Sequence, residues 1–155
     1  MKVAEALALR ADATRRVEQL RTRIVANARF QEGEEPSEDA RALLTEVGEV
    51  LDELEVLIRR INRTNSASRM ADGATVTDAL ARRDVLRSRH SVLSDAADAA
   101  AGRNSFGGRQ LRSELKMITA LPVADLRAQA DQVARELRDL DVRIQQANWE
   151  IDLLD

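Results

Sequence analysis

Long segments in which apolar residues recur every three or four positions constrain this chain more than any other feature. In the clearest segment the recurring residues are Leu44, Val47, Leu51, Leu54, Ile58 and Ile61. A nearly unbroken series of the same kind runs from Val123 to Leu154. This spacing places apolar side chains on one face of an α-helix, as in bundles and coiled coils. The sequence therefore predicts a mainly α fold of long helices, arranged as a four-helix bundle or coiled coil.

Four helical segments follow from this pattern and from the positions of Gly and Pro. We expect a single helical domain over residues 1–155, with helices at about 2–30, 37–64, 77–101 and 122–154. The stripe of the first helix comprises Ala6, Ala13, Val17, Leu20, Ile24 and Asn27, and that of the third comprises Ala79, Arg83, Leu86, His90, Leu93, Ala97 and Ala100. Ser37 is the expected N-cap of the second helix. A second apolar row (Leu43, Val50, Leu57) lies one position before the series that begins at Leu44. Together the two rows predict a face of the second helix broad enough to pack against two neighbouring helices.

Two connections between the helices have the pattern of short strands. Residues 66–76 contain Asp72-Gly73, a favoured hairpin turn, between two stretches that predict strands. Residues 110–119 alternate apolar and charged side chains, which is typical of a half-buried strand. We expect a small β-hairpin and one further short strand. They pair within one chain or between chains, because an isolated hairpin is only marginally stable.

Composition excludes several classes of function. The chain has no Cys and one His, which excludes thiolate nucleophiles, disulfides and multi-His metal centres. Its 24 basic and 27 acidic residues give a net charge of −3, which provides no general attraction to nucleic acid. No stretch reaches the roughly 18 to 20 apolar residues of a membrane-spanning helix, and Glu5 and Arg10 interrupt any signal-peptide core. The expectations are a cytoplasmic location, no cofactor and no nucleic-acid partner.

Charged groups on the expected helices favour structural roles over catalysis. Glu46 and Glu49 have the spacing of a magnesium-binding carboxylate pair, but the seam places them on the solvated outer face. Arg83 and His90 interrupt the third helix, where a register-setting polar pair is the simpler interpretation. A basic group on the same helix has no aromatic side chain nearby to stack on a base: Arg82, Arg83, Arg87 and Arg89. We expect no catalytic residue and no metal site. A non-enzymatic protein is favoured over the alternative, an enzyme that uses these carboxylates and the polar residues around Arg63 and Asp72.

A polar cluster away from the helical faces is the candidate ligand-binding site. Its residues are Asn62, Arg63, Asn65, Arg69, Asp72 and Asp78. Arg side chains near helix ends can bind phosphate or carboxylate. The competing interpretation is structural, because Asn caps helix ends and Asp-Gly forms turns.

The single Trp indicates a second packing surface. Val142 and Trp149 lie seven residues apart on the face of the fourth helix opposite its seam. A large aromatic side chain there packs against either a neighbouring helix or another subunit. Together with strands that need partners, this predicts a homo-oligomer with Val142 and Trp149 at the interface.

Several blocks of the sequence resemble the septicolysin-like family. They are Gln31-Glu32-Gly33-Glu34-Glu35-Pro36, Ile61-Asn62-Arg63-Thr64-Asn65-Ser66 and Asn148-Trp149. The resemblance extends over essentially the whole chain. It implies a bacterial protein with a mostly helical fold and a small β element, and the family name implies a cytolysin.

Three functional hypotheses follow. A pore-forming protein must be exported and must offer an apolar surface to lipid, whereas the apolar stripes here have the pattern of protein cores. The leading hypothesis is therefore a non-enzymatic, self-associating helical bundle protein. The alternative is a membrane-active, cytolysin-like protein, and the third is a ligand- or phosphate-binding protein that uses the polar cluster.

Overall fold

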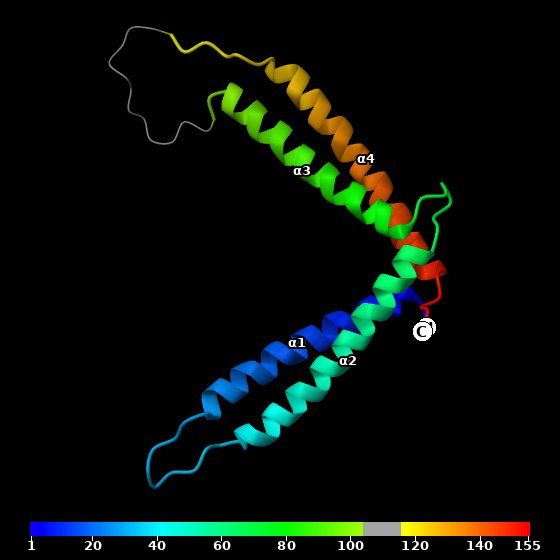
Figure 1. Ribbon diagram of the computed structural model, residues 1–155. Coiled ribbons are helices and arrows are strands. Elements are labelled where there is room, and N and C mark those ends of the chain that lie inside the picture. The colour runs from blue at the N-terminus through cyan, green and yellow to red at the C-terminus, as the bar shows by residue number, and fades with distance from the viewer. Residues whose placement is uncertain (104–115) are drawn as a thin grey trace. The chain divides into compact units, whose positions relative to one another are not determined.

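Four α-helices make up most of the chain in the computed structural model, which describes residues 1–103 and 116–155 (Figure 1). The helices are α1 (Val3–Asn27), α2 (Ala40–Ala67), α3 (Val76–Ala100) and α4 (Val123–Glu150). The mainly α fold expected from the apolar spacing is confirmed, and each predicted helix has a counterpart whose ends differ by a few residues.

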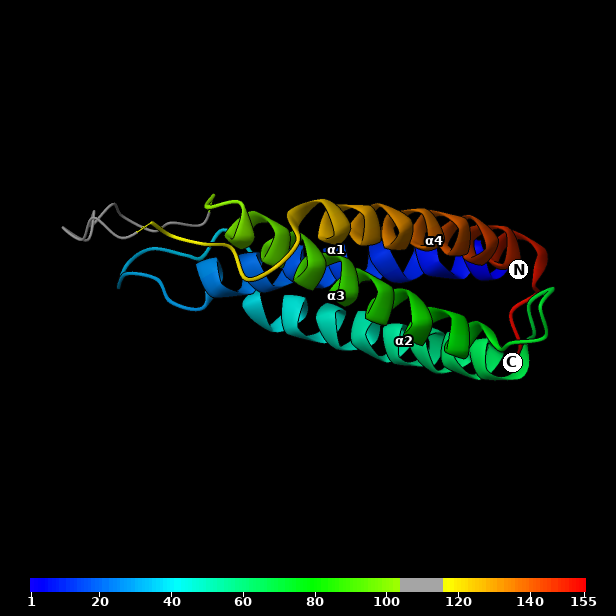
Figure 2. The ribbon, with the colours of Figure 1, turned by 90° about the horizontal axis from the view of Figure 1, so that it is seen from above.

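The chain divides into two compact units. Unit 1 consists of Met1–Thr77 and Gln145–Asp155, and unit 2 of Asp78–Ile144. In unit 1, α1 and α2 pack against each other and are joined at one end by residues 28–39 (Figure 2). The single domain expected over the whole chain stays a prediction.

The core of unit 1 consists of two clusters of apolar side chains. One cluster ties the start of α1 to the end of α2 and to the C-terminal residues, and the other fills the middle of the α1–α2 pair. The buried members of the first are Val3, Ala6, Ile61 and Leu153, and those of the second are Leu20, Leu43 and Val50. The apolar stripe predicted for α1 therefore faces the core.

Unit 2 pairs α3 with most of α4. The predicted stripes again face inward, since Ala79, Leu86 and Ala97 of α3 and Val133 and Leu140 of α4 are all buried. Ion pairs across the two helices, such as Arg82–Glu136 and Arg127–Asp98, flank this interface.

The start of α2 differs from the expectation. Asp39, and not Ser37, caps the helix: its Oδ1 accepts hydrogen bonds from the backbone N of Arg41 (2.9 Å) and of Ala42 (3.3 Å). The Ser37 hydroxyl instead donates to Oδ1 of Asn27 at 2.9 Å. Because Ser37 is engaged by the end of α1, α2 begins three residues later than predicted.

The predicted β-hairpin at residues 66–76 is not formed. A single antiparallel bridge joins Arg69 and Thr75, around a turn in which Gly73 has a φ of +85° and donates its N–H to the carbonyl of Met70. Residues 66–67 continue α2 and Val76 begins α3. The two helices therefore leave too few residues between them for a strand ladder.

The second predicted strand and the end of α4 also differ from the expectations. Residues 110–115 of that strand lie outside the described residues, and residues 116–119 form no strand. The last helix ends at Glu150 instead of continuing to 154. Beyond it the backbone N of Leu153 donates to the carbonyl of Met1 at 2.9 Å, which draws the last residues away from the helical path.

Candidate interaction surface

The most unusual surface of unit 1 is a row of large apolar side chains on α2. Leu44, Leu51 and Ile58, which we call the α2 apolar row, are 56%, 46% and 37% exposed. Val47 and Leu54 lie between them and are half-buried. An exposed apolar row along several turns of one helix is characteristic of a surface that binds another molecule.

The row is exposed because α1 covers the neighbouring row of α2. Leu43 and Val50 are buried against α1, and Leu57 packs on the cluster that contains Ile61. The sequence predicts burial of both rows against two neighbouring helices. Within unit 1, α2 packs against α1 alone, and α1 buries the row of Leu43 and Val50. The residues of α2 that face α1 are thus one position earlier than Leu44 and Leu51, the residues that the spacing favours. This one-position difference turns the α2 apolar row away from α1.

An open groove lies between α1 and α2, lined by charged side chains and by a few apolar ones such as Leu9 and Val56. Arg16 of α1 forms an ion pair with Glu46 of α2 across it. The expectation that Glu46 lies on a solvated outer face is wrong, because α1 packs on the Leu43 row and so faces Glu46. Glu49 lines the same groove and is exposed.

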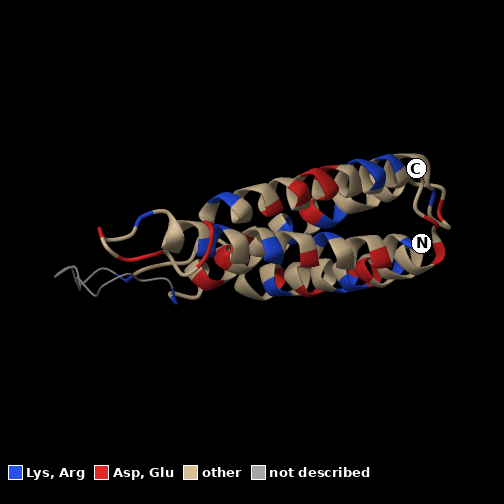
Figure 3. Ribbon diagram, turned by 90° about the horizontal axis from the view of Figure 1, so that it is seen from below, with Lys and Arg blue, Asp and Glu red and all other residues tan. Residues whose placement is uncertain are grey.

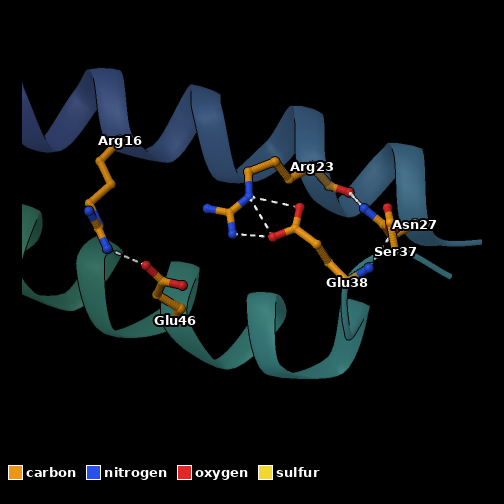
Figure 4. Close-up of polar contacts among 6 residues, drawn as sticks. All are labelled: Arg16, Arg23, Asn27, Ser37, Glu38 and Glu46. Atoms are coloured by element: carbon orange, nitrogen blue, oxygen red, sulfur yellow. Dashed lines mark hydrogen bonds and ion pairs between the residues drawn. The ribbon is translucent and has the colours of Figure 1, made fainter.

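Polar contacts join the connection between α1 and α2 to the end of α1 (Figure 4). Arg23 Nε donates to both carboxylate oxygens of Glu38, at 3.1 and 3.0 Å. The amide of Asn27 donates to the carbonyl of Arg23 at 2.9 Å, and its oxygen accepts from Ser37 and from the backbone N of Glu38. These bonds satisfy the end of α1 and fix where the chain turns back.

The Arg23–Glu38 contact shifts both titrations. The hydrogen bond from Arg23 lowers the pKa of the Glu38 carboxyl below its usual value, and the same contact raises the pKa of Arg23. At the other end of unit 1, a hydrogen bond from Lys2 lowers the pKa of Asp152. Each shift favours the charged pair in the folded chain.

The last residues of the chain are held between the start of α1 and the end of α2. The backbone N of Val3 donates to the carbonyl of Ile151 at 3.0 Å, and Lys2 Nζ lies 2.9 Å from Asp152 Oδ1. From α2, the Thr64 hydroxyl accepts a bond from the backbone N of Leu154 at 3.0 Å. Leu153 is thereby placed in the core.

Two arginines of α2 complete this C-terminal contact. Arg60 Nε donates to the carbonyl of Leu154 at 2.9 Å and its Nη2 to Asp155 Oδ1 at 2.7 Å. Arg63 donates to the main-chain oxygen of Asp155. The guanidinium groups near the end of α2 thus bind the chain's own C-terminal residues.

The residues of the predicted ligand-binding cluster are divided between local roles. Arg63 binds Asp155, Arg69 Nη1 donates to the carbonyl of Gly73 at 2.7 Å, and Asp72 Oδ1 accepts from the backbone N of Ala74 at 3.1 Å. Of the others, Asn62 is exposed, Asn65 is half-buried, and Asp78 lies in the first turn of α3, in unit 2. The bonds of Arg63, Arg69 and Asp72 stabilise a turn and the C-terminal residues.

The predicted interface residues of α4 are both exposed. Val142 is 67% exposed and Trp149 is 63% exposed. Neither side chain is therefore committed to the core of its own unit. The expectation that this face of α4 packs against a neighbouring helix or another subunit, and its role in an oligomer, stay predictions.

The remaining polar candidates show ordinary ion pairing. Arg83 contacts Asp84 at 3.4 Å, and Arg87 pairs with Asp141 of α4. Basic and acidic positions are interspersed along the helices (Figure 3). In the described residues no three His, Asp or Glu side chains are grouped as metal ligands.

Two of the residues that organise unit 1 were missed in the sequence. The spacing makes Asn27 one more position of the stripe of the first helix, whereas in the structure it is buried and its amide bonds to the end of that helix. Thr64 was read as part of a polar block, yet it is fully buried. Only contacts between distant segments reveal their partners, so local patterns cannot identify them.

The comparisons place the chain among proteins of unknown function. The model of the family of unknown function DUF6847 matches residues 10–153. The chain belongs to this family. A crystal structure of a functionally unknown conserved protein from Corynebacterium diphtheriae is 40% identical, covers 99% of both chains and has a TM-score of 0.91. No curated protein matches the chain.

The match to the solved structure agrees with the mainly α fold, and neither the family nor that structure comes with a stated activity. The resemblance to septicolysin-like proteins stays a prediction. Among the helices of the described residues, none has the length and apolar character needed to cross a membrane.

Proposed function

We propose that this protein is a non-enzymatic, self-associating helical bundle protein whose α2 apolar row is buried when copies associate. The observation that carries the proposal is the exposure of Leu44, Leu51 and Ile58 on a helix whose other apolar row is already covered by α1. Burying a fully exposed Leu or Ile side chain contributes about 1.5–3 kcal/mol, and these three side chains, which are already about half-buried, contribute roughly half of that each. Three such side chains in line provide a substantial driving force for association.

The spacing of the row favours a helix as the partner. Leu44, Leu51 and Ile58 repeat every seven residues, with Val47 and Leu54 between them. This is the arrangement by which one helix packs against another through knobs and holes. A second copy of the chain supplies long helices with apolar faces of the same spacing.

The test is a charge placed in the row, compared with a charge placed elsewhere on α2. Leu51→Lys should weaken self-association by roughly tenfold or more, because a buried ammonium would replace a buried Leu. Val56→Lys is the matched control, since Val56 is 55% exposed on the same helix but lines the groove beside α1. Sedimentation velocity over a concentration series measures both.

The two alternative functions give different results in the same experiment. Equal association of Leu51→Lys, Val56→Lys and the unmodified chain would contradict the proposal. An amphipathic row also suits a lipid surface, so the same samples are added to dye-loaded liposomes, where the proposal predicts no leakage. Leakage by the unmodified chain that Leu51→Lys abolishes would favour the membrane-active alternative.

A further inference from the structure

The core of unit 1 is completed by residues that the chain reaches only after it has passed through unit 2. Residues 145–155, which we call the C-terminal segment, belong to unit 1, and the residues of unit 2 precede them. Leu153 is buried in the cluster that joins the start of α1 to the end of α2, and Ile151 packs against this cluster. Unit 1 is therefore incomplete without the C-terminal segment.

Unit 1 holds the end of this segment largely through its main chain. The backbone N of Val3 donates to the carbonyl of Ile151, and the carbonyl of Met1 accepts from the backbone N of Leu153. Three side chains of α2 bind main-chain atoms of residues 154 and 155. In such recognition the main-chain bonds give affinity, and a pocket for one side chain, here Leu153, gives specificity. These contacts are the same whichever copy of the chain supplies the segment.

The connection between α2 and α3 is the part of the chain that can open for an exchange. The helix α4 continues without a break from unit 2 into unit 1, so the C-terminal segment stays joined to unit 2 by a helix. Residues 68–75, in contrast, form a turn with a single bridge. In an extended conformation they would span roughly 26 Å. Short connections of this kind are the hinges at which identical elements are exchanged between protomers.

We propose that copies of the chain exchange the C-terminal segment, so that the segment of one copy docks on α1 and α2 of a second copy. Residues 68–75 open as the hinge. The exchanged form keeps every bond between the segment and unit 1, and the bonds that it gives up are those of the turn. Because a short connection holds the chain's own segment at an effective concentration on the order of millimolar, the exchanged form should increase with protein concentration. This inference rests on the proposed self-association and names the segment that one copy supplies to another.

The bridge between Lys2 and Asp152 allows a direct test, because the chain contains no Cys. The backbone bonds on either side make these residues a non-hydrogen-bonded antiparallel pair, whose Cα atoms lie about 4.5 Å apart, within the range of a disulfide. A chain with Lys2→Cys and a differently tagged chain with Asp152→Cys are co-expressed, purified through both tags and oxidised. Exchange predicts a disulfide between the two chains. Arg10→Cys in place of Lys2→Cys is the matched control, because Arg10 is exposed roughly 12 Å further along α1.

The disulfide and the native mass together separate this inference from the proposed function. A native mass of several chains without the disulfide between Lys2→Cys and Asp152→Cys would overturn the exchange and leave self-association in place. An equal yield from Arg10→Cys would overturn it too, since the disulfide would then not depend on the bridge. If the disulfide forms while Leu51→Lys associates like the unmodified chain, the exchange stands and the role of the α2 apolar row fails. The mass of one chain at every concentration contradicts both proposals.

Substitution in the hinge gives a second, independent result. The closed turn requires a φ of +85° at Gly73, which a residue with a branched Cβ disfavours, whereas an extended hinge does not. Gly73→Val should therefore raise the association constant roughly tenfold or more. Gly33→Val is the matched control, because Gly33 has a φ of +90° in the connection between α1 and α2, which the exchange leaves closed. Sedimentation velocity measures both, and an association constant of Gly73→Val that is unchanged or lower would overturn the inference.

Discussion

At the scale of single residues, Thr64 holds the C-terminal residues on α2. Its side chain is fully buried. The hydroxyl donates to the carbonyl of Arg60 at 2.8 Å and accepts from the backbone N of Leu154 at 3.0 Å. A buried hydroxyl that satisfies two partners is costly to remove, because the backbone donor loses its acceptor.

Thr64→Val, which keeps the shape and removes the hydroxyl, should destabilise the folded chain by about 1–3 kcal/mol. Thr45→Val is the control, because the exposed Thr45 hydroxyl makes a similar bond to the carbonyl of Arg41 on the same helix. Urea unfolding measures both variants. Equal stability of the two would mean that the contact with Leu154 contributes nothing.

Residue-level expectations held where a residue's role depends on its own helix. Ala79, Leu86 and Ala97 are buried as the spacing predicts. Thr64 was not predicted, because its partner Leu154 lies 90 residues away in the sequence. Likewise, the ion pair between Lys2 and Asp152 joins two ends of the chain that no local pattern connects.

At the scale of the elements, α2 shows that a helix can be predicted correctly while the side of it that packs on its neighbour is predicted incorrectly. Its two adjacent apolar rows both have helical spacing, so periodicity alone does not decide which one meets α1. The structure selects the row of Leu43 and Val50. The other row, with Leu44 and Leu51, is then left on the surface, and this became the candidate site.

The connection between α1 and α2 should contribute a pH-dependent part of the stability. The pKa of the Glu38 carboxyl is lower in the folded chain than in the unfolded chain. As the pH falls, the unfolded chain therefore binds a proton first, and the free energy of unfolding decreases until the pH lies below the lowered pKa. Glu38→Gln should therefore reduce the loss of stability as the pH falls below 4.5, the ordinary pKa of a glutamate carboxyl. Thermal unfolding at several pH values measures this.

Glu35→Gln, an exposed position in the same connection, serves as the control. It should keep the acid-dependent loss of the unmodified chain. A Glu38→Gln variant with the same pH profile as Glu35→Gln would show that the contact with Arg23 does not contribute to stability.

At the scale of the whole molecule, the sequence predicted the class of fold, and it left open whether the Trp149 face of α4 packs on a neighbouring helix or on another subunit. The prediction of a hairpin at residues 66–76 was wrong, because α2 and α3 extend into these residues and leave only a single bridge. The α2 apolar row was not predicted as a surface, because its spacing is that of a core. The polar cluster was predicted as a site, but several of its residues bind within the chain.

Self-association is the central claim about the whole molecule, and native mass measures it most directly. Light scattering of the unmodified chain over a dilution series should give a mass that is a multiple of 17.2 kDa at high concentration. The mass should fall toward that of one chain on dilution if exchange is fast, or stay at the multiple if association is tight. A mass of one chain at every concentration would contradict the account.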